Sequence, residues 1–133
     1  MNEYVTDTQA LVKFMQNKLV VNKEYHQIYE NAEVGKDIII IPAIVLMEIM
    51  YLCEKNRIPV SVFDIEQLLD SKNYRLEPLT LEILKVATSI DDIPELHDRL
   101  IAATAVYLDL PIITNDEVIL NSKHIKTIPT RSV

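Results

Sequence analysis

The stretch Ile38-Ile39-Ile40-Ile41-Pro42-Ala43-Ile44-Val45-Leu46-Met47-Glu48-Ile49 decides the fold. Its isoleucines form a β-branched run without polar alternation, a pattern typical of a strand that is covered on both faces. Pro42 ends this strand and can open a helix that we expect to run from Ala43 to about Asn56. A covered strand followed at once by a helix predicts a parallel sheet with helices on its faces.

Strands and helices alternate outward from this stretch in both directions. Further strands are expected at residues 4–7, 74–79, 111–114 and 125–128, and helices at residues 10–15, 23–34, 61–69, 94–109 and 116–120, with another after Thr80. Gly35 is suited to end helix 23–34, and Pro78 weakens strand 74–79 or places it at a sheet edge. The alternation predicts an α/β sandwich with a central, mostly parallel sheet, whose functional groups gather beyond the carboxyl ends of the strands. Since no linker or repeat interrupts it, we expect a single domain over residues 1–133.

The composition excludes several classes of site. The chain has 133 residues, a net charge of −7, one glycine and one cysteine, with 49% hydrophobic and 25% charged residues. One glycine excludes the glycine-rich phosphate loops and the nucleophile elbow of hydrolases, because each motif needs at least two. One cysteine, Cys53, excludes an internal disulfide and a thiolate zinc site, and we expect it to be a small core side chain.

We expect a cytoplasmic protein with no membrane partner. The amino-terminal residues lack a basic region followed by an apolar one, so they do not resemble a signal peptide. The longest apolar run, Ile38 to Met47, is ten residues and contains Pro42, whereas a bilayer-spanning helix needs roughly 20 residues.

Two aspartates stand at corresponding strand ends. Asp7 ends the first expected strand and Asp116 lies just beyond strand 111–114. Each could be only a turn residue or a helix N-cap. If the two strands are parallel, however, both carboxylates lie at the same edge of the sheet.

Glu48 is the only charged residue from Ile38 through Cys53. Apolar residues surround it on every side of its helix, which predicts a buried helix. An unpaired buried carboxylate costs several kcal/mol. Glu48 therefore either forms an ion pair with an Arg or a Lys, or reaches a polar pocket where it helps to hold a cation.

Asp98 lies near the start of helix 94–109, with the small residues Ala102 and Ala105 on the following turns. It could serve only to complement the helix dipole. The neighbouring His97 could transfer protons, but an exposed or capping histidine is the simpler interpretation.

Together, Asp7, Glu48, Asp98 and Asp116 suggest one carboxylate cluster. Carboxylates about 5 Å apart repel by roughly 3 kcal/mol per pair at an effective dielectric constant near 20. Protons or cations must neutralise such a cluster, and hard oxygen ligands without thiolates select Mg²⁺ or Mn²⁺. Such ions activate water and bind phosphodiester oxygens, which predicts a metal-dependent phosphodiesterase.

The chain resembles PIN domains, and among them the VapC-type toxins of prokaryotic toxin–antitoxin pairs. Four fragments in order carry the resemblance: Tyr4-Val5-Thr6-Asp7-Thr8, Ile41 to Ile49 with Glu54-Lys55-Asn56-Arg57-Ile58-Pro59, Ile93 to Ala105, and Leu110-Pro111-Ile112-Ile113-Thr114-Asn115-Asp116. The resemblance implies an α/β/α sandwich and a nuclease that cuts single strands. It places Asp7, Glu48, Asp98 and Asp116 at catalytic metal-site positions, and Thr8, Thr114 and Asn115 where they orient ligands or substrate.

The chain departs from the usual family pattern at two positions. Asn56 replaces a usual glycine, which the tolerance of Asn for positive φ allows. Gln9 stands where Asn, Ser or His is more usual.

We therefore expect a Mg²⁺- or Mn²⁺-dependent endoribonuclease that is the toxin of a toxin–antitoxin pair. The alternative is a PIN-fold module that binds protein or RNA without turnover. A phosphatase with Asp7 as nucleophile would need a second Asp where Gln9 stands, and a receiver domain would need paired acids near the first strand.

The charge bears on the partners. The sequence pI of about 4.9 is not that of a typical nucleic-acid binder, so RNA would depend on the metals and on local cations. The candidates are Lys13, Lys55, Arg57, Arg99, Lys123 and Lys126. The acidic surface suits a small basic antitoxin, whose Arg or Lys could enter the acid cluster. The expected core does not have room for all apolar side chains, with Phe14, Tyr51 and Phe63 as examples. Exposed apolar side chains favour a homodimer.

Overall fold

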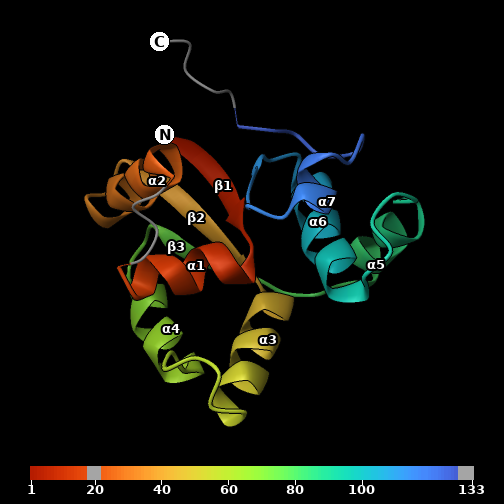
Figure 1. Ribbon diagram of the computed structural model, residues 1–133. Coiled ribbons are helices and arrows are strands. Elements are labelled where there is room, and N and C mark those ends of the chain that lie inside the picture. Colours follow the sequence, from red (N-terminus) through yellow and green to blue (C-terminus); the bar gives the residue numbers. More distant parts are fainter. Residues whose placement is uncertain (18–21, 129–133) are drawn as a thin grey trace.

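The computed structural model describes residues 1–17 and 22–128. Strands and helices follow one another along the chain (Figure 1): β1 (Asn2–Thr6), α1 (Thr8–Met15), α2 (Lys23–Glu33), β2 (Asp37–Pro42), α3 (Ala43–Glu54), α4 (Val62–Leu69), β3 (Tyr74–Glu77), α5 (Leu81–Thr88), α6 (Leu96–Leu108), β4 (Ile112–Ile113) and α7 (Glu117–Leu120).

The strands form one sheet in the order β3-β2-β1-β4. Every described strand pair is parallel, with Val5 of β1 opposite both Ile40 of β2 and Ile112 of β4. This confirms the expected parallel α/β sheet. The chain proceeds from β1 through β2 to β3 and then returns to the other side of β1 as β4. Open α/β sheets bind ligands outside the carboxyl ends of strands where the order reverses, which here is the edge between β1 and β4.

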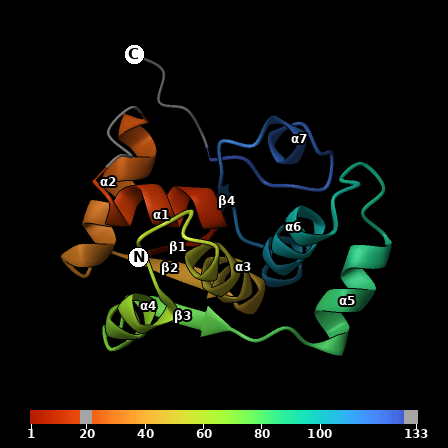
Figure 2. The same ribbon diagram turned by 60° about the horizontal axis from the view of Figure 1, so that its bottom comes forward.

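The core lies between the sheet and the helices on its two faces, in the predicted α/β/α arrangement. All six residues of β2 are buried, as expected of a strand covered on both sides. In α6, Ala102 and Ala105 are almost fully buried, and these small side chains allow the helix to approach β1. Figures 1 and 2 both show α5, α6 and α7 together on one side of the molecule, with α1, α2 and α4 on the other.

Local capping explains several helix ends. Ser61 and Asp64 form a reciprocal capping box at the start of α4, and Thr80 caps α5, so both helices begin close to the expected positions. After α2, Gly35 has φ +80° and Lys36 N–H donates to the Asn31 carbonyl, which closes a Schellman turn. Asn56 ends α3 with φ 56°, in agreement with the expectation that it can replace glycine there.

Some expected elements are wrong or shifted. The helix expected at residues 94–109 begins only at Leu96, because the side chain of Glu95 caps it by accepting the Asp98 N–H. Residues 125–128 form no strand. The segment before them is held instead by Asp92, which accepts hydrogen bonds from the Ser122 hydroxyl and the Lys123 N–H.

The prediction that α3 is buried all round is also wrong. Ile44, Val45 and Ile49 face the core, whereas Met47, Met50 and Tyr51 are 40%, 45% and 51% exposed. Cys53 is partly exposed and is not a fully buried core residue. Helix α3 thus has more hydrophobic side chains than its packing against the rest of the protein buries.

Of the three aromatic residues that were expected not to fit in the core, two lie outside it. Tyr51 and Phe63 are exposed, but Phe14 packs against the core and stacks on Tyr29 with ring centroids 4.5 Å apart. In the part of the chain that the structure describes, no helix is both long and apolar enough to cross a membrane.

Candidate active site

A pocket of about 380 Å³ lies beyond the carboxyl ends of β1 and β4. Asp7, Glu48, Asp98 and Asp116 all line it. These four acids come from the end of β1, the second turn of α3, the first turn of α6 and the start of α7. The tertiary structure thus brings the predicted acids to one place. Their role as metal ligands stays a prediction.

Asp7 is the most buried of these acids, with 5% of its surface exposed. Its Oδ1 accepts the N–H of Ala10 at 2.8 Å, which caps α1, and its Oδ2 accepts the hydroxyl of Thr114 at 2.5 Å. Burial, reinforced by the charges of Asp116 and Glu48, raises the pKa of Asp7 from 3.8 to about 6, although both hydrogen bonds oppose the shift. Asp7 therefore carries a charge that the fold does not fully compensate.

Asp116 is both an N-cap and a pocket residue. Its Oδ1 accepts the N–H groups of Val118 and Ile119 at 2.9 and 3.2 Å. Its own N–H donates to the Thr114 hydroxyl at 3.0 Å. Asp7 and Asp116 each cap a helix and also line the pocket. One carboxylate can do both, because its two oxygens carry enough lone pairs to accept the capping hydrogen bonds and still bind a ligand.

Glu48 reaches the pocket from α3 with 23% of its side chain exposed. The hydroxyl of Thr8 donates to its Oε1 at 2.7 Å, and His97 Nδ1 lies 3.7 Å from its Oε2. Among the residues that the structure describes, no Arg or Lys pairs with it, so of the two alternatives for Glu48 the structure favours the polar pocket over an ion pair with one of these residues. His97 is half exposed and also lies 3.4 Å from Glu95 Oε1.

Asp98 is partly buried at the start of α6. Burial, followed by the charges of Asp116, Glu95, Glu48 and Asp7, raises its pKa from 3.8 to about 6. No hydrogen bond to its carboxylate is found within residues 1–17 and 22–128. Asp98 is thus available to a ligand in the pocket.

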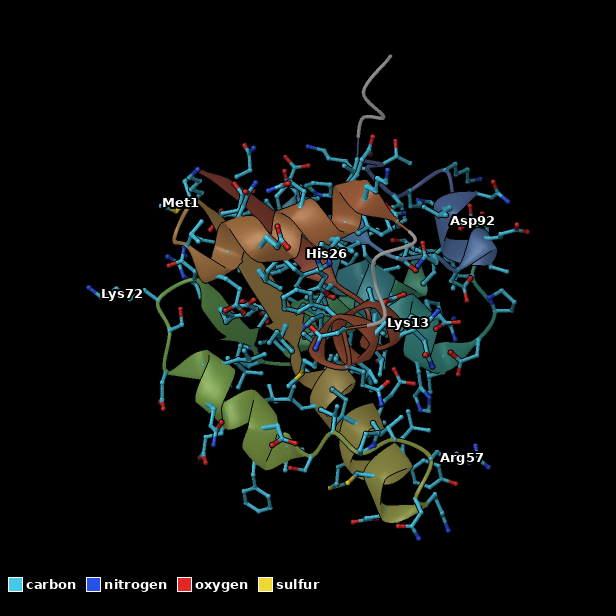
Figure 3. All side chains as sticks on the ribbon, turned by 60° about the vertical axis from the view of Figure 1, so that its left-hand side comes forward. Met1, Lys13, His26, Arg57, Lys72 and Asp92 are labelled. Atoms are coloured by element: carbon cyan, nitrogen blue, oxygen red, sulfur yellow. The ribbon has the colours of Figure 1, made fainter. Side chains whose placement is uncertain are left out.

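The donor set fits a hard divalent cation. Four carboxylates converge, the charges of neighbouring acids help to raise the pKa of Asp7 and of Asp98, and no described Lys or Arg lies within ion-pair distance of any of the four. Lys13 of α1, which is labelled in Figure 3, also lines the pocket and forms no ion pair with the described residues. Oxygen donors without sulfur suit Mg²⁺ or Mn²⁺. No three of these acids have ligand atoms mutually within 4.8 Å, so a cation held by three of them requires the side chains to move closer together.

The three polar residues expected beside the acids all lie at the pocket. Thr8 and Asn115 line it, and Thr114 is fully buried beneath it. Thr8 and Thr114 each donate a hydrogen bond to an acid, whereas Asn115 is exposed. Sequence reasoning missed Tyr25, whose hydroxyl donates to the Thr114 carbonyl at 2.7 Å, since nothing local links residues 89 positions apart.

Two other features of the described structure are also candidate sites. Asp91, Asp92 and His124 have ligand atoms within 4.8 Å of one another, but hydrogen bonds among them and to Ser122 and Lys123 account for this spacing. A larger pocket of about 590 Å³ opens at the amino-terminal edge of the sheet, lined by Asn2, Lys23, Asn31 and Asp37 among others. It is lined by two acids, Glu24 and Asp37, together with Lys23, whereas four acids line the smaller pocket, so the smaller pocket is the better chemical candidate.

The PIN domain family model matches residues 4–123. No curated protein matches the chain significantly. Among solved structures, the chain is similar to a chain of VapBC2 from Rickettsia felis bound to a DNA fragment from their promoter, with a TM-score of 0.66, 17% identity, and coverage of 95% of this chain and 97% of that one. It is also similar to a chain of a toxin–antitoxin complex from Klebsiella pneumoniae, with a TM-score of 0.63, 17% identity, and coverage of 93% and 96%. At this identity the two structures establish the fold.

Proposed function

The chain belongs to the PIN domain family, and from this premise we propose that it is a metal-dependent endoribonuclease and the toxin of a toxin–antitoxin pair. One observation carries the proposal. Asp7, Glu48, Asp98 and Asp116 line one pocket, and no described Lys or Arg is paired with any of them. A structural acid cluster would be expected to have its own cationic partner, whereas a cluster that binds metal needs none.

The pocket residues have different roles in the proposed reaction. Asp7, Glu48, Asp98 and Asp116 would hold Mg²⁺ or Mn²⁺. A bound divalent cation supplies a Lewis acid that activates water toward a phosphodiester and neutralises the charge on its oxygens. Thr8 and Thr114 orient Glu48 and Asp7 by hydrogen bonds.

Asp98 is the best candidate for proton transfer. Its carboxylate lines the pocket and accepts no hydrogen bond from the described residues, so it is free to take a proton there. Lys13 and Asn115, at the mouth of the pocket, can bind a phosphate oxygen and a base or ribose hydroxyl of the substrate.

The toxin role has independent support. One similar structure is VapBC2 of Rickettsia felis and the other is a toxin–antitoxin complex of Klebsiella pneumoniae, and the present chain covers at least 96% of each similar chain. Its net charge of −7 favours a basic partner. An Arg or a Lys of an antitoxin inserted among the four acids would neutralise them as a cation does and would block the pocket.

The first experiment is cleavage of single-stranded RNA by the purified protein. We expect cleavage with Mg²⁺ or Mn²⁺, none with a chelator, and at least a hundredfold loss in Asp98→Asn. Asp70→Asn, which changes an exposed carboxylate at the end of α4, is the matched control and should cleave normally. Equal cleavage by the Asp98→Asn variant would contradict the proposal. RNA binding that persists with chelator and never yields product would favour the alternative of a binding module.

The toxin role is tested in growing bacteria. Expression of the chain alone should arrest growth, and expression of Asp98→Asn should not. Arrest by both proteins at equal abundance would show that toxicity does not depend on the pocket.

A further inference from the structure

The segment that carries Asp116 has few contacts with the sheet. Strand β4 is only two residues long, and it is held to β1 by Val5 N–H to the Pro111 carbonyl at 2.9 Å and Asp7 N–H to the Ile113 carbonyl at 3.1 Å. The chain leaves the sheet at Thr114. The position of Asp116 relative to Asp7 therefore depends on what holds Thr114.

The hydroxyl of Thr114 joins the two aspartates. It donates to Asp7 Oδ2 at 2.5 Å and accepts the Asp116 N–H at 3.0 Å. One side-chain oxygen thus fixes the direction of one carboxylate and the backbone of the other. A displacement of Thr114 would therefore disturb both.

Tyr25, in the distant helix α2, holds the Thr114 backbone by a hydrogen bond. It lies in the first turn of α2 with 7% of its surface exposed, and its hydroxyl donates to the Thr114 carbonyl at 2.7 Å. Burial, followed by the charges of Asp7 and Glu24, raises the pKa of Tyr25 above 10, so the hydroxyl remains a donor at neutral pH. The side chain of Asn22 caps α2 by accepting the Tyr25 N–H at 3.1 Å, which fixes the ring from its own side.

We infer that Tyr25 is a positioning residue for the acidic pocket: by holding the Thr114 carbonyl, it fixes Asp7 and Asp116 relative to each other, and the binding of a divalent cation depends on that placement. The inference rests on the proposed metal site. It assigns Tyr25 no contact with substrate. It makes the docking of α2 a determinant of metal affinity.

The test compares two conservative changes at buried tyrosines. Tyr25→Phe removes the bond to Thr114, and Tyr74→Phe removes a 3.0 Å bond to Glu33 that does not involve the pocket. Mn²⁺ affinity is measured by calorimetry without RNA, and kcat and KM for RNA are measured at limiting and saturating Mn²⁺. We expect Tyr25→Phe to weaken Mn²⁺ binding roughly tenfold and to recover much of its kcat at saturating Mn²⁺. Tyr74→Phe should bind Mn²⁺ as the wild type does.

A double-mutant cycle separates positioning from a general loss of packing. Thr114→Val should weaken Mn²⁺ binding, and Thr114→Ser, which keeps the hydroxyl, should restore it. If Tyr25 acts through Thr114, the variant that combines Tyr25→Phe with Thr114→Val should bind Mn²⁺ as Thr114→Val alone does.

The outcomes distinguish this inference from the proposed function. Unchanged Mn²⁺ affinity in Tyr25→Phe, or equal losses in Tyr25→Phe and Tyr74→Phe, would overturn the positioning role while wild-type cleavage of RNA still supported the nuclease. Fully additive losses in the cycle would overturn it as well. Wild-type protein that binds Mn²⁺ but cuts no RNA would defeat the proposed nuclease, and the affinity measurements would still decide the role of Tyr25.

Discussion

Single carboxylates in the pocket serve both the fold and the proposed chemistry. Asp7 caps α1 through Oδ1, and yet its pKa is raised to about 6 because it is buried beside Asp116 and Glu48. Asp98 has a pKa raised to about 6 without any capping role for its side chain. Such shifts mean that the ionised forms destabilise the folded protein.

The pH dependence of stability follows from these two residues. Since the folded pKa of about 6 exceeds the unfolded value of 3.8, the folded state binds more protons between these pH values. The metal-free protein should therefore lose stability as the pH rises from about 4 through 6, with the loss complete above that range. Asp91 and Asp92 have lowered pKa values, so their contribution changes only below about pH 4.

Thermal unfolding with a chelator at pH 5 and pH 7.5 measures this effect. Asp98→Asn should raise the Tm at pH 7.5 by a few degrees and reduce the difference between the two pH values. Asp70→Asn should leave both unchanged. A metal-free Tm that rises from pH 5 to pH 7.5, with no effect of Asp98→Asn, would contradict the expectation.

Lys13 offers a second prediction at the residue scale. It is an exposed cation at the rim of the acidic pocket, so we expect it to contact a substrate phosphate. Lys13→Gln should raise KM for RNA several-fold with little change in kcat, and should reduce the salt dependence of binding by about one ion. Lys85→Gln, at an exposed lysine of α5, is the control. Identical salt dependence in both variants would remove Lys13 from the substrate contact.

Among the helices and strands, the burial of α3 differs most from what the sequence predicts. Its buried side holds Ile44, Val45 and Ile49 against the core, and Glu48 lies beside the pocket, while Met47 and Tyr51 remain exposed. The helix must stop soon after Glu54 for the chain to turn toward α4. Asn56 makes this turn with φ 56°, and Arg57 N–H donates to the Leu52 carbonyl at 2.9 Å.

The end of α3 can be tested at Asn56. The left-handed conformation costs a residue such as alanine roughly 1 kcal/mol, whereas glycine adopts it freely. Asn56→Ala should lower the free energy of unfolding by about that amount, and Asn56→Gly should leave it unchanged or raise it slightly. Chemical denaturation of both variants measures the difference. Equal stability of the two variants would show that the turn relaxes to another conformation.

For the whole molecule, metal binding should couple to folding. A ligand that binds only the folded state stabilises it by about 2.7 kcal/mol at a hundredfold excess over its Kd. Saturating Mn²⁺ at pH 7.5 should therefore raise the Tm by roughly 5 °C or more. The shift should nearly vanish in Asp98→Asn but persist in His124→Gln, which changes the competing cluster at Asp91 and Asp92. The reverse pattern would place the metal at that cluster.

The single domain over residues 1–133 and the homodimer stay predictions. One domain should unfold in a single calorimetric transition whose van't Hoff and calorimetric enthalpies agree. Exposed Met47, Met50, Tyr51 and Phe63 make self-association worth measuring by sedimentation. Two transitions would divide the chain, and a monomer at all accessible concentrations would exclude the homodimer.

Much of this architecture was readable from short-range patterns. The isoleucine run predicted β2, Ser61 and Thr80 predicted helix starts, and the four acids were recognisable because each interrupts or ends an apolar element. The strand expected at residues 125–128 failed because its hydrophobic residues signal burial without saying which element covers them.

Local chemistry therefore settled which segments become helices or strands and which residues can carry charge, since caps, turns and side-chain alternation act within a few positions of the chain. Three-dimensional packing alone settled which side of α3 is left bare, that Glu48 meets Thr8 and His97 in place of an Arg or a Lys, and that Tyr25 holds Thr114 across 89 positions. Those outcomes depend on the sum of many distant contacts competing for the same surfaces, and no stretch of neighbouring residues contains that information.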